Sequence, residues 1–279
     1  MIPSFVITFR ETLEAALVVG IVLGYLARTK QSQYRGLVYT AVAAGSAASV
    51  IGALLFTRLA GGFEGKAEQI FEGVTMLIGA VLLTTMILWM MRQRHVAAEL
   101  QQKVATELAE AHRFGLFPLV FIAVLREGIE TVIFLGAASF VSGDNSLIGA
   151  LAGVVAAVLL GCAIFIGSMK VNLKTFFNIT SVLLIFFAAG LVGQGVHELG
   201  EAGLVPTLIG QVWDINPAVG PDGSYPILHE SGYVGSVLKA LLGYNGNPSL
   251  AELLSWLAYL VLVVLVWRVR ERAHTLVST

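Results

Sequence analysis

The chain has 279 residues, of which 57% are hydrophobic and 13% are charged, and its formal net charge is −1. Charged residues make up about a quarter of an ordinary soluble domain, so this composition excludes that class and indicates a lipid environment. The near-neutral charge gives no reason to expect a nucleic-acid partner, and the single cysteine, Cys162, excludes a disulfide framework within the chain.

Seven apolar segments have the length of a membrane-spanning helix, which needs about 20 residues to cross about 30 Å of hydrocarbon. They predict an all-α, polytopic membrane protein with seven transmembrane helices. We expect these helices at residues 3–27, 36–57, 70–91, 114–141, 147–169, 176–196 and 250–267.

The first and fourth of these spans carry charged residues near their middle. The apolar pieces 114–125 and 131–141 are each too short to cross a membrane alone, so the charges between them must lie within the bilayer. The same argument applies to the first span. The charged residues are Arg10, Glu11 and Glu14 in the first span and Arg126, Glu127 and Glu130 in the fourth.

The basic residues of the loops predict the orientation of the chain. Twelve lysines and arginines follow the first, third, fifth and seventh spans, whereas three lie on the opposite side. Because basic loops face the cytoplasm, we expect an external N-terminus and a cytoplasmic C-terminus. The expected location is the cell membrane, which in a bacterium is the inner membrane.

An internal repeat relates the two charged spans. Arg10-Glu11-Thr12-Leu13-Glu14 matches Arg126-Glu127-Gly128-Ile129-Glu130 at an offset of 116 residues, and Gly20 matches Gly136 at the same offset. Since three crossings separate the copies, spans one to three and four to six form two inverted three-helix repeats plus one extra helix. Transporters built in this way place substrate sites at the repeat interface.

These features predict one transmembrane domain, 1–279, with six parts. Residues 95–112 have the pattern of an amphipathic cytoplasmic helix, although a plain solvated connector is the favoured interpretation. Ser249 and Glu252 have capping-box spacing at the start of the last helix. The parts are repeat one at 3–91, the cytoplasmic connector at 92–113, repeat two at 114–196, an external loop at 197–249, the last helix at 250–267 and a cytoplasmic tail at 268–279.

The charged motif has the chemistry of a cation site. Residues three and four apart share a helix face, so Glu11 and Glu14 present two carboxylates together and Arg10 reaches Glu14 across one turn. If both copies face each other, four carboxylates and two guanidinium groups give a formal charge of −2, and the carboxylates release protons when a cation binds. Oxygen donors alone suit ferric iron, manganese, magnesium or calcium better than copper(I) or zinc. The alternative is a pair of buried salt bridges that fix helix packing.

Two acidic clusters flank the motifs on the predicted external side. Each could pass a cation inward, although acids at helix ends are also ordinary interfacial residues. The candidates for cation entry are Glu68 and Glu72 at the start of the third span and His197, Glu198 and Glu201 at the end of the sixth.

The sequence resembles the oxidase-dependent iron permease family over nearly its whole length. This family includes the fungal high-affinity iron permease and the permease subunit of the bacterial elemental ferrous iron uptake system. Besides the two Arg-Glu-x-x-Glu motifs, the resemblance is carried by Glu68-Gln69-Ile70-Phe71-Glu72-Gly73, Gly195-Val196-His197-Glu198-Leu199 and Leu241-Leu242-Gly243-Tyr244-Asn245.

The resemblance implies an iron permease that is not an enzyme and carries no cofactor, with iron as its substrate and an extracytoplasmic iron-binding or oxidising protein as its partner. It marks Glu11, Glu14, Glu127 and Glu130 as metal ligands and Arg10 and Arg126 as their charge partners. One departure is Thr12, which stands in the first motif where Gly128 stands in the second. A carboxylate-based transporter or exchanger of another divalent cation or of protons is the alternative.

Overall fold

The computed structural model describes residues 1–90, 102, 115–142, 147–165, 173–206, 209–219 and 224–277. Every regular element in these ranges is helical. There is one short 3-10 helix, η1 (Ser32–Tyr34). The α-helices are α1 (Ile2–Arg28), α2 (Arg35–Ala60), α3 (Lys66–Met90), α5 (Leu116–Ser142), α6 (Leu147–Phe165), α7 (Leu173–Glu201), α8 (Tyr233–Leu242) and α9 (Leu250–Val277).

Five helices, α2, α3, α6, α7 and α9, are long and apolar enough to cross a membrane. The chain is therefore a multi-pass membrane protein, which confirms the prediction of an all-α, polytopic architecture. The other two long helices, α1 and α5, have 27 residues each and carry the charged motifs. In its described residues, each of the seven predicted spans overlaps one of these seven helices.

The segment predicted as an external loop contains α8, a helix that was not among the predicted elements. This helix ends at Leu242 and is capped by Gly243, whose φ of +69° lies in the left-handed region that favours glycine. The predicted connector 92–113, with its amphipathic helix at 95–112, lies outside the described residues apart from Gln102. The helical part of the predicted tail continues α9 as far as Val277.

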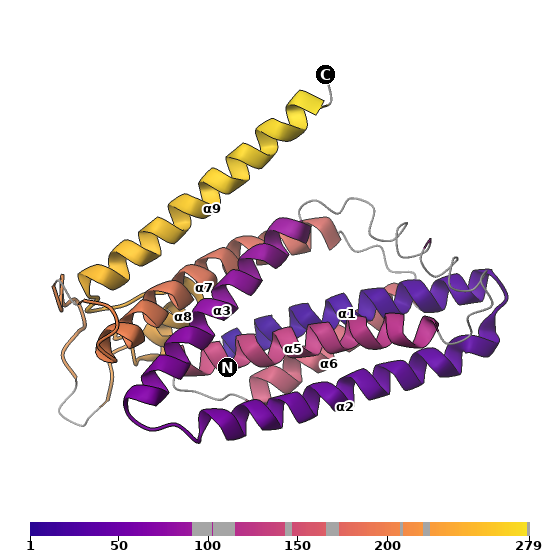
Figure 1. Ribbon diagram of the computed structural model, residues 1–279, viewed down its shortest axis with the longest axis horizontal. Coiled ribbons are helices and arrows are strands. Elements are labelled where there is room, and N and C mark those ends of the chain that lie inside the picture. Colours follow the sequence, from indigo (N-terminus) through magenta and orange to yellow (C-terminus); the bar gives the residue numbers. More distant parts are fainter. Residues whose placement is uncertain are drawn as a thin grey trace. The chain divides into compact units, whose positions relative to one another are not determined.

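The described helices form two compact units, and α5 contributes to both. The first unit contains α1, α2, α5 as far as Leu135, and α6. In this unit α6 lies alongside α1 (Figure 1) and faces it with small residues, one every four positions. Thr8 Oγ1 on α1 donates a hydrogen bond to the carbonyl oxygen of Ala150 at 2.9 Å, as expected where small residues let two helices approach closely. The buried small residues of α6 are Gly149, Gly153, Ala157 and Gly161.

A hydrophobic core joins α1, α2 and α5 in the same unit. The core residues are at most 8% exposed, and they bring the end of α1 against the start of α2 and the start of α5. Because α1 and α5 both contact this core, their charged segments are held in one neighbourhood. The core consists of Val22, Leu26, Val38, Ala41, Leu116, Val120 and Val124.

The second unit contains α3, the end of α5, α7, α8 and α9. Helix α3 packs on α7 where Gly73 and Gly195 bring the two backbones together, since a Cβ on Gly73 would stand 2.9 Å from the carbonyl oxygen of Gly195. The end of α8 packs on α7 in a similar way, through Gly243 and Gly190. Helix α9 contacts α7 near Gly193, which lies next to Glu252.

Candidate functional site

The first charged motif forms a buried ion-pair cluster on α1. The side chain of Arg10 is fully buried, and its Nη1 and Nη2 atoms lie 2.6 Å from Glu11 Oε1 and 2.8 Å from Glu14 Oε1. The side chains of Glu11 and Glu14 are 1% and 11% exposed. One guanidinium group thus bridges two carboxylates on a single helical turn, as the i, i+4 spacing of Arg10 and Glu14 predicts.

The second motif, on α5, has the same connectivity but a different exposure. Arg126 pairs closely with Glu127 Oε1, and its Nε atom lies 3.6 Å from Glu130 Oε1. The two carboxylates are nearly buried, with 3% and 15% of their side chains exposed, whereas the Arg126 side chain is 51% exposed. Two copies of one sequence motif therefore give two electrostatic environments.

The two motifs meet within the first unit. Glu11 and Glu14 from α1 and Glu127 from α5 each offer a carboxylate oxygen, and these oxygens lie within 4.8 Å of one another. Glu130 does not belong to this group. The spacing allows three carboxylates from two helices to bind one cation through oxygen ligands.

Several carboxylate oxygens in this cluster have no hydrogen-bond donor. The arginines pair with the Oε1 atoms of Glu11 and Glu127. Four buried carboxylate oxygens of the cluster accept no hydrogen bond in the described part of the chain: Glu11 Oε2, Glu14 Oε1, Glu127 Oε2 and Glu130 Oε2. A buried oxygen without a donor is costly, and a bound cation removes that cost. The cluster is therefore better suited to binding a cation than to a self-contained salt bridge.

Packing against α2 explains the glycine of the second motif. Ser49 on α2 lies directly against Gly128, and a Cβ at residue 128 would overlap the Ser49 side chain. The Ser49 hydroxyl is also fixed, because it donates a hydrogen bond to the carbonyl oxygen of Gly45 at 2.8 Å. Thr12 can occupy the equivalent position of the first motif, but a threonine at position 128 would push α5 away from α2.

The predicted entry residues lie on α3 and α7 in the second unit. Glu201 Oε2 accepts a hydrogen bond from Gln69 Nε2 at 3.0 Å, which links the two helices. His197 Nε2 lies 3.3 Å from Glu201 Oε1. Glu68 is exposed, and Glu72 and Glu198 are partly exposed.

Glu252 was expected to cap α9, and its carboxylate has a further set of contacts. Its backbone N–H donates to Ser249 Oγ at 3.2 Å, as a capping box requires. The carboxylate points elsewhere: its Oε1 atom accepts a hydrogen bond from Asn245 Nδ2 at 2.6 Å, and its Oε2 atom lies 3.6 Å from His197 Nδ1. The Leu241–Asn245 motif directly before α9 is the sequence signal that could have indicated the contact between Asn245 and Glu252.

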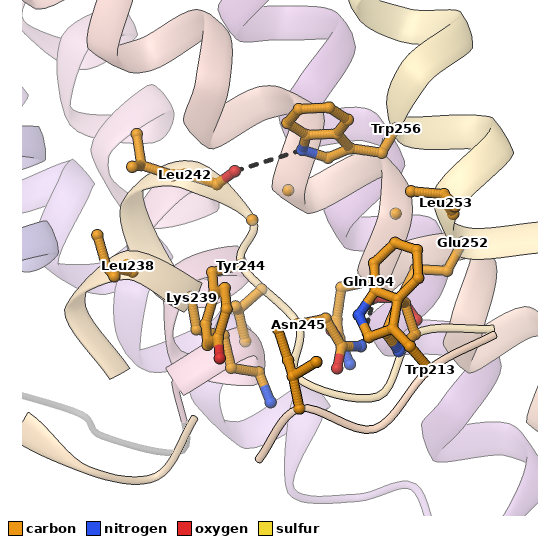
Figure 2. A pocket seen from close by; sticks show the side chains of 16 residues that line it. Gln194, Trp213, Leu238, Lys239, Leu242, Tyr244, Asn245, Glu252, Leu253 and Trp256 are labelled. Carbon is orange, nitrogen blue, oxygen red and sulfur yellow. Dashed lines mark hydrogen bonds between the residues drawn. The ribbon is translucent and has the colours of Figure 1, made fainter. Parts of the chain in front are cut away.

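Glu252 also lines a cavity of about 370 Å³ in the second unit. Figure 2 shows Trp213, Tyr244 and Trp256 around this cavity, with Gln194, Asn245 and Glu252 grouped on one side of it. The indole N–H of Trp256 donates to the carbonyl oxygen of Leu242 at 3.3 Å. The cavity therefore combines aromatic walls with a small polar region.

The sequence profile described as the iron permease FTR1 family matches residues 1–275 of the chain. Curated relatives match along their whole length. A protein of Shigella sonnei (strain Ss046) named ferrous iron permease EfeU is 33% identical over 282 residues, which cover 100% of this chain and 99% of the relative. The protein of the same name from Yersinia pestis is 31% identical over 277 residues, 98% of this chain and 95% of the relative. No solved structure matches the chain significantly.

Proposed function

The chain belongs to the iron permease family and is a transporter rather than an enzyme, and from this premise we propose that it imports ferrous iron through the carboxylate cluster of α1 and α5. The relatives in two bacterial genera are named ferrous iron permeases. The observation that carries the proposal is the meeting of Glu11, Glu14 and Glu127, whose carboxylate oxygens lie within 4.8 Å of one another. Charged groups within membrane helices are costly and usually mark a functional site.

In this proposal Glu11, Glu14, Glu127 and Glu130 bind the ion, and Arg10 and Arg126 balance the charge of the empty site. The arginines pair with the Oε1 atoms of Glu11 and Glu127 and leave the Oε2 atoms of these two carboxylates for the cation. Because the guanidinium groups neutralise only part of the negative charge, the cluster attracts a cation but does not hold it irreversibly. A transport site needs this compromise between entry and release.

We further propose seven crossings arranged as two inverted repeats, residues 3–91 and 114–196, followed by the last helix. The packing of the helices supports this arrangement. The repeat pairs α1 with α5, α2 with α6 and α3 with α7, so an inverted pair should make each contact twice. Helix α1 packs on α6 and α5 packs on α2, which are equivalent contacts, while α3 and α7 pack on each other.

The proposed orientation has the N-terminus outside and the C-terminus in the cytoplasm of the cell. The acidic residues at the start of α3 and the end of α7 would then face the exterior and gather the ion before it reaches the paired motifs. An extracytoplasmic iron-binding or oxidising protein would deliver iron to this side. The gathering residues are Glu68, Glu72, His197, Glu198 and Glu201.

Radiolabelled iron uptake tests the proposed function. In cells that lack their own iron importers, we expect the chain to raise the uptake of ferrous iron, and excess unlabelled ferrous iron to compete more strongly than manganese, magnesium or calcium. A cell with an empty vector is the control. Equal competition by magnesium or calcium would instead favour the exchanger of another divalent cation, which is the second candidate.

A further inference from the structure

A histidine–carboxylate pair outside the two Arg-Glu-x-x-Glu motifs has the spacing of two ligands of one metal ion. His197 on α7 and Glu252 at the start of α9 lie in the second unit, and their Nδ1 and Oε2 atoms are 3.6 Å apart. The Glu252 side chain is 7% exposed and lines the 370 Å³ cavity, while the His197 side chain is 34% exposed. A distance of 3.6 Å is too long for a hydrogen bond, so a direct hydrogen bond does not explain why the two atoms face each other.

The other contacts of the two side chains show what each atom can do. His197 Nε2 lies 3.3 Å from Glu201 Oε1, so a neutral imidazole that keeps its proton on Nε2 places this N–H beside a carboxylate and presents a lone pair at Nδ1. Glu252 Oε1 accepts the Asn245 hydrogen bond, and Glu252 Oε2 accepts none among the described residues. Two acceptor atoms thus face each other at 3.6 Å, and a cation between them would satisfy both.

The separation and the surroundings fit a metal ion. Imidazole nitrogen and carboxylate oxygen ligands stand about 2.0 to 2.2 Å from a transition-metal ion, so two ligands of one ion are separated by about 3 to 4 Å. Metal-bound histidines usually donate their other N–H to a carboxylate, and metal-bound carboxylates are usually held by a further hydrogen bond. Asn245 supplies the hydrogen bond to the carboxylate, and the Glu201 carboxylate lies 3.3 Å from His197 Nε2 on the histidine side.

We propose that His197 and Glu252 form a second cation site, which binds a divalent transition metal through Nδ1 and Oε2. The identity of the ion as ferrous iron rests on the proposed function, whereas the site itself rests on this geometry. A nitrogen and an oxygen ligand suit iron(II), manganese(II) or zinc(II) better than calcium or magnesium. Glu252 lines the cavity of about 370 Å³ (Figure 2), which leaves room for water ligands on the carboxylate side of the site. With two protein ligands the site is weak, as a transit site on an import path requires.

Manganese(II) is a suitable probe because its electron spin echo reports directly bonded nitrogen. The full-length protein in lipid nanodiscs should show imidazole nitrogen coupling on bound manganese, and this coupling should disappear in both His197→Gln and Glu252→Gln. Asn245→Leu, which removes the outer hydrogen bond, should weaken manganese binding at this site about tenfold or more. His229→Gln is the matched histidine control and should keep the coupling, since His229 Nδ1 accepts a hydrogen bond from the Ser231 backbone at 3.0 Å.

The nitrogen signal separates this site from the paired motifs, whose ligands are carboxylates. Glu127→Gln should keep the nitrogen coupling while it loses iron uptake, so failure of uptake and failure of this site are distinguishable. Absence of nitrogen coupling in the wild type would overturn the proposal, as would coupling that survives both His197→Gln and Glu252→Gln. If the wild type shows no nitrogen coupling and both variants are less stable to heat, His197 and Glu252 form a structural ion pair instead of a metal site.

Discussion

Glu127→Gln is expected to reduce iron uptake by about 10- to 150-fold at equal protein levels in the membrane. Glutamine has nearly the same shape but lacks the charge, and an interaction with a charged group contributes about 1.5–3 kcal/mol, which corresponds to this loss in ion occupancy. The Glu127 side chain is 3% exposed, and it is the member of the carboxylate group that α5 contributes. Radiolabelled uptake in cells without their own importers measures the effect.

Two further variants test whether the loss of uptake is specific to Glu127. Glu64→Gln is the matched control, because Glu64 is exposed in the connection between α2 and α3, and it should leave uptake unchanged. Glu130→Gln should have a smaller effect than Glu127→Gln, because Glu130 lies outside the group of three carboxylates. Wild-type uptake by a folded Glu127→Gln protein would show that the paired motifs are structural and that the ion takes another path.

The sequence was informative about the long helices because membrane length and hydrophobicity are local properties. The argument that the apolar pieces beside Arg126 are too short to cross alone placed the charges in the middle of α5, where they lie in Leu116–Ser142. The i, i+4 spacing also predicted that Arg10 would reach Glu14, and the two side chains are 2.8 Å apart. These predictions depend only on the residues of one helix.

Features that depend on tertiary packing were missed. Helix α8 has 10 residues, a length at which an isolated helix is marginal and depends on its neighbours. Here its end packs on Gly190 of α7 through Gly243. The position of the Glu252 carboxylate was missed for the same reason, since its partners Asn245 and His197 come from a loop and from another helix.

The unequal burial of the two arginines also lay beyond the sequence, because both motifs read Arg-Glu-x-x-Glu. Arg10 is fully buried, whereas the Arg126 side chain is 51% exposed. In the first unit the surroundings of α1 include α6, whose small residues allow close approach to Phe5 and Thr8. Exposure of this kind follows from which neighbour covers a helix face, and the motif does not encode it.

This asymmetry predicts that the two arginines differ in their contribution to stability. Arg10→Gln removes the guanidinium group that bridges Glu11 and Glu14 and leaves two buried carboxylates without it, which costs about 3–5 kcal/mol of unfolding free energy. Arg126→Gln should cost less, because the Arg126 side chain is half-exposed and its second ion pair is longer, with Nε 3.6 Å from Glu130 Oε1. Unfolding of the purified variants in one detergent, followed by intrinsic fluorescence, measures the difference.

Arg10→Lys and Arg58→Gln complete this comparison. Lysine keeps the positive charge at position 10 but cannot form the planar fork that reaches two carboxylates. The unfolding free energy of Arg10→Lys should therefore lie between those of the wild type and Arg10→Gln. Arg58 is exposed near the end of α2, and its replacement should have no effect. Equal destabilisation by Arg10→Gln and Arg126→Gln would contradict the asymmetry. If instead only Arg10→Gln is destabilised while both variants lose uptake, the first motif anchors the fold of the site and the two motifs share the binding of the ion.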